Sequence, residues 1–277
     1  MAGILTIAHL TLYEARRRRI MLASAICGAA FLAVFATGVY FVFRDLGPEN
    51  VLQRAITNMM TTMLGLYAVN FLTVASAVLL SIDTLSGEIG SGVIQTLASK
   101  PLRRADIVLG KWLAYLLLTL VYLVVMAGGV VLIIRLITGY THPGLVRALP
   151  LVALEAAVLL TVAIAGGTRL STVTNGIVAF GFYGVAFVGG LIEQVGTFTG
   201  NLAARDMGTA VSLISPADAL WRMAAYELTP PIVRGLDAGP PMIWNASAPT
   251  MAMVVWSVGL ILVTLAVSVR TFNRRAL

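Results

Sequence analysis

The chain has 277 residues, of which 59% are hydrophobic and 11% charged, and its mean hydropathy is +0.93. Soluble domains carry about 25% charged residues, so this composition excludes a water-soluble protein and indicates an integral membrane protein. The formal net charge of +7 calls for no nucleic-acid partner. Membrane proteins concentrate Lys and Arg in cytoplasmic loops and beside anionic headgroups, which accounts for a charge of this size.

Before the first long apolar stretch, residues 1–19 carry apolar side chains at helical spacing. These are Ile4, Ile7, Ala8, Leu12 and Ala15. Such spacing predicts a short helix lying in the membrane interface. We interpret the arginine run at 16–19 as an anchor on the cytoplasmic side, with a lipid-binding patch as the alternative.

Six apolar stretches are long enough to cross a bilayer, since about 20 helical residues span a hydrocarbon core of about 30 Å. We expect the spans at residues 20–43, 58–82, 109–137, 149–167, 173–192 and 249–269. None shows the alternation typical of a barrel strand. The sequence therefore predicts a single all-α domain of six transmembrane helices over residues 1–277.

The distribution of basic residues predicts the orientation of these spans. With the N-terminus in the cytoplasm, twelve of the 19 Lys and Arg residues lie on that side and seven on the other. Cytoplasmic loops carry the excess of Lys and Arg. We therefore expect a multi-pass protein of the plasma or inner membrane with both termini cytoplasmic.

The longest polar interruption in the first half of the chain is the connector at residues 83–108. We expect a surface helix that begins near Glu88. Removal of the Glu88 carboxylate should leave the membrane fold intact. Pro101 should end this helix, because it lacks an amide donor and disfavours helical geometry at the preceding residue. The residues alone are equally compatible with an ordinary amphipathic connector.

A second long segment, residues 196–247, is expected outside the membrane between the fifth and sixth spans. Its piece at 217–228 has an apolar and a polar side, so it should lie on the outer interface, with Trp221 in the aromatic belt. The segment could cap an exit, dock an extracytoplasmic protein, or seal the outer face of an assembly.

Polar side chains inside the spans are candidates for a translocation pathway, since burying an ionisable group in a membrane is costly. The candidates are Asn70, Thr73, Ser76 and Glu155. Two alternatives are structural: Glu155 could pair with Arg135 or Arg147, and the others could bond between helices. Glu193 lies at the end of the fifth span, where we expect it to be solvated.

The connector residues resemble the cytoplasmic signature of ABC transporter type 2 permeases. The matching residues are Asp83, Glu88, Gly92, Leu97, Pro101, Arg104 and Lys111. Residues 215–218, Ser-Pro-Ala-Asp, are similar to the Ser/Asn-Pro-x-Asp segment of that family, and we mark Pro216, Asp218, Trp221 and Arg222 as candidates there. Length and layout are similar to those of the permease of the nitrous-oxide-reductase copper/sulfur maturation transporter. We do not assign the substrate of that transporter to this chain.

This resemblance implies the transmembrane subunit of an ATP-driven transporter, in a family where export predominates. It also implies a dimer with a second permease copy and two separate ATPase subunits that hold ATP and Mg, so the chain itself would bind no cofactor. Arg169, in the loop at 168–174, is a second candidate for contact with the ATPase, and a topology anchor is the equal alternative. Independently of the resemblance, the chain lacks a phosphate-binding loop: Gly110-Lys111 is followed by Trp112, and Ala105 stands where the first glycine should be.

Three other classes remain as alternatives: an ion-coupled secondary transporter, a membrane scaffold or receptor subunit, and a membrane enzyme. The first should show internal repeats or paired interrupted helices, and we find no convincing repeat. The third needs a catalytic or metal constellation, but His9 and His142 fall on opposite sides of the expected topology. No catalytic or metal-binding residue is therefore assigned.

Overall fold

The computed structural model describes residues 2–46, 51–90, 103–142, 144–229 and 250–274, and the regular structure in these ranges is entirely helical. Six helices are long and apolar enough to cross a membrane, which confirms the expected all-α fold with six spans. They are α2 (Arg19–Arg44), α3 (Val51–Gly90), α5 (Arg104–Thr138), α6 (Leu145–Gly167), α7 (Thr172–Thr199) and α12 (Met251–Arg274).

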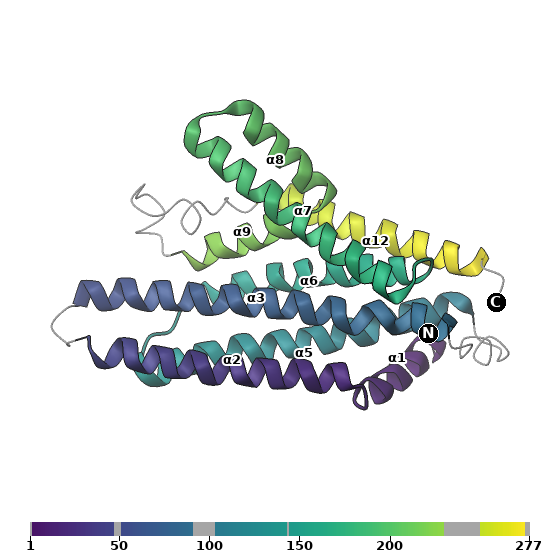
Figure 1. Ribbon diagram of the computed structural model, residues 1–277, viewed down its shortest axis with the longest axis horizontal. Helices are drawn as coiled ribbons and strands as arrows, with labels where there is room; N and C mark the ends of the chain where they lie inside the picture. Colours follow the sequence, from purple (N-terminus) through teal and green to yellow (C-terminus); the bar gives the residue numbers. More distant parts are fainter. Residues whose placement is uncertain (1, 47–50, 91–102, 143, 230–249, 275–277) are drawn as a thin grey trace.

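Three shorter helices complete the described part of the chain. They are α1 (Ala2–Ala15), α8 (Leu202–Ile214) and α9 (Ala217–Leu228). The segment expected as an N-terminal helix thus forms α1, which packs along the start of α5, where a Cβ on Gly110 would overlap Ile7. Helix α8 folds back along α7, and α1 lies at the same end of the molecule as the end of α12 (Figure 1).

Local sequence sets several helix ends. The amide of Gly139, at φ 74°, closes α5 by donating to the carbonyl of Arg135, and Gly200, at φ 71°, closes α7. A positive φ strains residues that carry a Cβ, so glycine suits both positions. The side chains of Ser171 and Asn201 accept amide hydrogen bonds at the starts of α7 and α8. These caps produce the tight turns on either side of α7.

Helices α3 and α6 form the centre of the bundle. In each, 61% of the most apolar window is buried, against 6% in α2. Helix α2 buries only Gly28, Val39 and Phe43, so most of its surface is left for lipid or for another chain. Side chains on the central helices therefore depend most on partners within this chain.

Two expectations about the connector and the outside segment are wrong. Helix α3 continues to Gly90, so Glu88 lies in its last turns and does not begin a surface helix. Helix α9 does not lie on the interface: almost all of its side chains are buried, including Trp221, which packs edge-on against Tyr67 with ring centroids 5.2 Å apart. Arg222, one of the charges that made α9 look amphipathic, is compensated inside the fold by Asp218 and Glu193.

Candidate functional site

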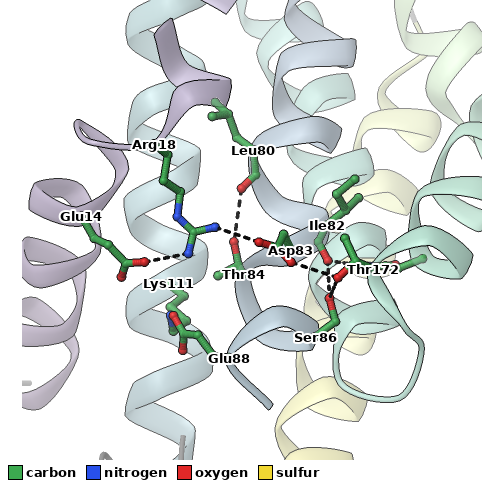
Figure 2. A network of polar contacts seen from close by, with 11 residues as sticks. Glu14, Arg18, Leu80, Ile82, Asp83, Thr84, Ser86, Glu88, Lys111 and Thr172 are labelled. Atoms are coloured by element: carbon green, nitrogen blue, oxygen red, sulfur yellow. Dashed lines mark hydrogen bonds and ion pairs between the residues drawn. The ribbon is translucent and has the colours of Figure 1, made fainter. Parts of the chain in front are cut away.

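A network of polar contacts joins three parts of the chain near the end of α3 (Figure 2). Asp83 accepts a hydrogen bond from the Thr172 hydroxyl at 2.9 Å and an ion-pair contact from Arg18 at 3.4 Å. Arg18 also contacts Glu14 at 2.7 Å, and the hydroxyls of Ser86 and Thr172 are 2.9 Å apart. One carboxylate thus connects the turn between α1 and α2 and the start of α7 to α3.

An ion pair between Glu88 and Lys111 lies further along α3 and joins it to α5 (Figure 2). Both side chains are shielded, with 9% and 4% of their surfaces exposed respectively. A buried charge is stable only when an opposite charge or several hydrogen bonds compensate it. The two signature residues therefore stabilise each other, and the carboxylate of Glu88 is not presented at the surface.

These contacts fix the two ends of the chain segment that joins α3 to α5. Arg104, at the start of α5, donates to the carbonyl of Asn273 at 3.2 Å and so connects α5 to the end of α12. Three signature positions fall outside the described residues: they are Gly92, Leu97 and Pro101. Arg169 is exposed in the short turn between α6 and α7, next to the Thr172 contact.

All four pathway candidates are buried in the single chain, at the contact of α3 with α6 and α7. The amide of Asn70 donates to Glu155 at 3.4 Å, so the structure brings two of them together. The second carboxylate oxygen of Glu155 and the hydroxyls of Thr73 and Ser76 have no hydrogen-bond partner in the described part of the chain. Arg147, one of the expected partners of Glu155, instead contacts Glu227 at 3.8 Å.

The outside-segment candidates form a second buried network, between α7 and α9. Arg222 contacts Asp218 at 2.8 Å and Glu193 at 2.7 Å, which corrects the expectation that Glu193 is solvated. Burial raises the pKa of Asp218 to about 6, although Arg222 acts in the opposite direction. A Cβ on Gly190 would overlap the Asp218 carboxylate, so glycine is needed where α9 crosses α7. Pro216 directly precedes α9 and its C=O accepts the first helical bond, from Leu220.

Sequence reasoning missed several residues that hold these networks together. The arginine run was interpreted as an anchor, yet its third member, Arg18, contacts Asp83 across the fold. The Glu14–Arg18 spacing of four is a local signal for a helical ion pair that could have singled it out. Asn175 had no such signal: its side-chain amide donates to the carbonyls of Ile82 and Ala163, at 3.1 and 2.7 Å, and so joins three helices.

A family model described as an ABC-2 family transporter protein matches residues 5–277. The chain belongs to this family. It is therefore a transport subunit, the transmembrane permease of an ABC transporter, and it works with ATP-binding subunits. Its six apolar helices agree with a multi-pass membrane protein. A search of curated proteins found no match.

Proposed function

We propose that this permease is an exporter subunit that forms the translocation pathway as a dimer and is driven by two separate ATPase subunits. ATP and Mg would be held by those subunits. Both termini would be cytoplasmic, in the plasma or inner membrane, and an extracytoplasmic protein could dock near the α7–α8 hairpin. Family membership supports the assignment of ATP binding to separate subunits. The excess of Lys and Arg at one side supports the orientation.

The observation that carries the coupling proposal is the position of the two polar contacts around the α3–α5 connection. Glu88 and Lys111 join the two helices beside that connection, and Asp83 joins α3 to Thr172 at the start of α7. An ATPase that pushes on the connection, or on Arg169 in the α6–α7 turn, would therefore move α3, α5 and α7 together. The shielded Glu88–Lys111 pair lies in a low-dielectric interior, where a polar contact is strong enough to transmit such a displacement.

The polar residues of α3 support a pathway along its contact with α6. Asn70, Thr73 and Ser76 follow at intervals of three, which places them on neighbouring positions of one helix face. Glu155 meets this face from α6. Separation of α3 from α6 during transport would expose a carboxyl, an amide and two hydroxyls to the passing substrate.

Reconstitution with the ATPase subunits tests the proposal. The permease should co-purify with an ATPase encoded beside it, and the complex should hydrolyse ATP, whereas the isolated permease should neither bind nor hydrolyse it. The matched control is an ATPase whose phosphate-loop lysine is replaced by alanine, which should assemble but not hydrolyse. Specific ATP binding by the isolated chain, or transport that follows an ion gradient without ATP, would reject the proposal.

Orientation needs a separate measurement. In a Cys27→Ser background, which removes the single native cysteine, the exposed sites Arg169→Cys and Arg205→Cys should react with an impermeant thiol reagent from opposite faces. Arg169 should react from the cytoplasm. Labelling of both sites from one face would contradict the proposed topology.

A further inference from the structure

Three arginines border one cleft at the end of the bundle where α12 ends. The cleft has a volume of about 460 Å³, and the described residues that line it are Thr168, Arg169, Arg270, Thr271 and Arg274. Arg169 comes from the turn between α6 and α7, while Arg270 and Arg274 come from the last turns of α12, four residues apart. All three arginines are exposed, and no acidic residue lines the cleft within the part of the chain that the structure describes.

The ends of helices α6 and α12 explain only part of this charge. Each helix carboxyl end favours a basic residue by about 0.3–1 kcal/mol, and Arg270 and Arg274 fit that role on α12. Three guanidinium groups around one open volume also repel one another. An anion in the cleft would remove that repulsion, and guanidinium groups bind phosphate oxygens with paired, charge-assisted hydrogen bonds.

The position of the cleft indicates the source of the phosphate. Arg270 and Arg274 end a helix that is long and apolar enough to span a membrane, so we expect their side chains at the depth of the lipid headgroups. Basic pockets between transmembrane helices on the cytoplasmic side are typical sites for anionic lipid headgroups. An acidic loop of an ATPase subunit is the competing partner, but a concave cleft next to the bilayer suits a headgroup better than a protein surface.

We propose that the cleft lined by Arg169, Arg270 and Arg274 binds the phosphate-bearing headgroup of an anionic phospholipid. The bound lipid connects the end of α12 to the α6–α7 turn. That turn is followed by Thr172, which contacts Asp83 at the end of α3. Lipid binding at this cleft therefore stabilises the polar network at the same end of the bundle.

Native mass spectrometry of the purified permease, released from a neutral detergent, tests this proposal without any ATPase subunit. The probes are dioctanoyl phosphatidylglycerol, dioctanoyl phosphatidylcholine and inorganic phosphate. The permease should retain phosphatidylglycerol in preference to the other two. Each arginine lost should weaken that binding about fivefold, so Arg270→Gln with Arg274→Gln should weaken it roughly 25-fold.

The matched control replaces two exposed arginines outside the cleft, Arg44→Gln with Arg205→Gln, and should bind phosphatidylglycerol within about twofold of the parent. Unchanged melting temperature and elution volume will show that the cleft variant is folded; if it is not, Arg169→Gln alone provides the fivefold test. Equal loss in the cleft and control variants would overturn the proposal. So would binding of inorganic phosphate as tight as that of phosphatidylglycerol, or cleft variants that lose the ATPase subunit while keeping the lipid.

Discussion

The ion pair between Glu88 and Lys111 allows a quantitative test of how the connection between α3 and α5 is held. Both side chains are more than nine-tenths shielded. Removing one member of a buried ion pair leaves the other charge uncompensated and costs about 3–5 kcal/mol, whereas replacing both members by apolar residues is often neutral. Lys111→Met and Glu88→Gln should each destabilise the permease, and Glu88→Leu with Lys111→Met should recover most of the loss.

The assay is melting of helical circular dichroism in a neutral detergent. Each kcal/mol corresponds to about 2–4 °C for a chain of this size class, so a loss of about 3 kcal/mol should lower the melting temperature by about 6–12 °C. Two exposed charges serve as matched controls: Arg44→Met in α2 and Asp206→Asn in α8 should each shift it by less than about 2 °C. The reasoning is refuted if the single variants match these controls, or if the double variant shows the sum of both losses.

Three further outcomes are expected. The pKa of Asp218 is raised from 3.8 to about 6 in the folded protein. Between these pH values the folded state therefore binds more protons than the unfolded state. The stability that protonated Asp218 contributes should fall as pH rises from about 4 to 6. The melting temperature of Asp218→Asn relative to the parent should rise over that interval, and parallel pH profiles would contradict the assignment. Gly190→Ala should lower the free energy of unfolding by about 1–3 kcal/mol, because the added Cβ overlaps Asp218. Gly184→Ala, where an added Cβ meets nothing within 4 Å, should leave the melting temperature unchanged in the same assay. Equal effects of the two substitutions would contradict the close approach of Gly190 to Asp218. Thr73→Cys in a Cys27→Ser background should resist thiol reagents in the isolated permease and react when the ATPase subunits and ATP are present, and failure to react in either state would remove it from the pathway.

The number and order of the spans could be predicted because hydropathy measures transfer into a membrane directly. Each expected span lies within a helix of the structure or overlaps it closely. The end of α3 could not be predicted in this way. Its apolar pattern stops near Ile82, yet the helix continues to Gly90, because Asp83 and Glu88 find partners on neighbouring helices. A hydropathy window counts these acids as polar residues and therefore predicts a surface loop.

The same limitation explains the error at α9. The polar side expected for this helix rests on Arg222 and Glu227, beside apolar residues at helical spacing, which is typical of a helix with a solvated side. In the fold, Arg222 is neutralised by Asp218 and by Glu193 of α7, so the charged side can face inward. Family resemblance pointed to Asp218 without indicating its partner. Pairings between distant helices depend on packing, which spacing along one chain does not determine.

Helix α7 is held near both of its ends by polar contacts of different strength. Near its start, the Thr172 hydroxyl contacts Asp83 and Ser86, and side-chain hydrogen bonds of this kind contribute about 1–3 kcal/mol. Near its end, about 30 Å away for 21 helical residues, Glu193 pairs with the shielded guanidinium of Arg222. Added Cβ atoms at the intervening Gly181 and Gly184 would meet nothing within 4 Å, so one face of the middle of α7 is open, while Ala179 and Ala186 are buried against the rest of the chain. A push on the α3–α5 connection is therefore transmitted to the start of α7 through Thr172 and through Asn175, which bonds to Ile82 and Ala163, while Arg222 holds the far end. This places the moving end of the helix next to the α3–α5 connection and the arginine cleft, where an ATPase subunit or a bound lipid can act on it.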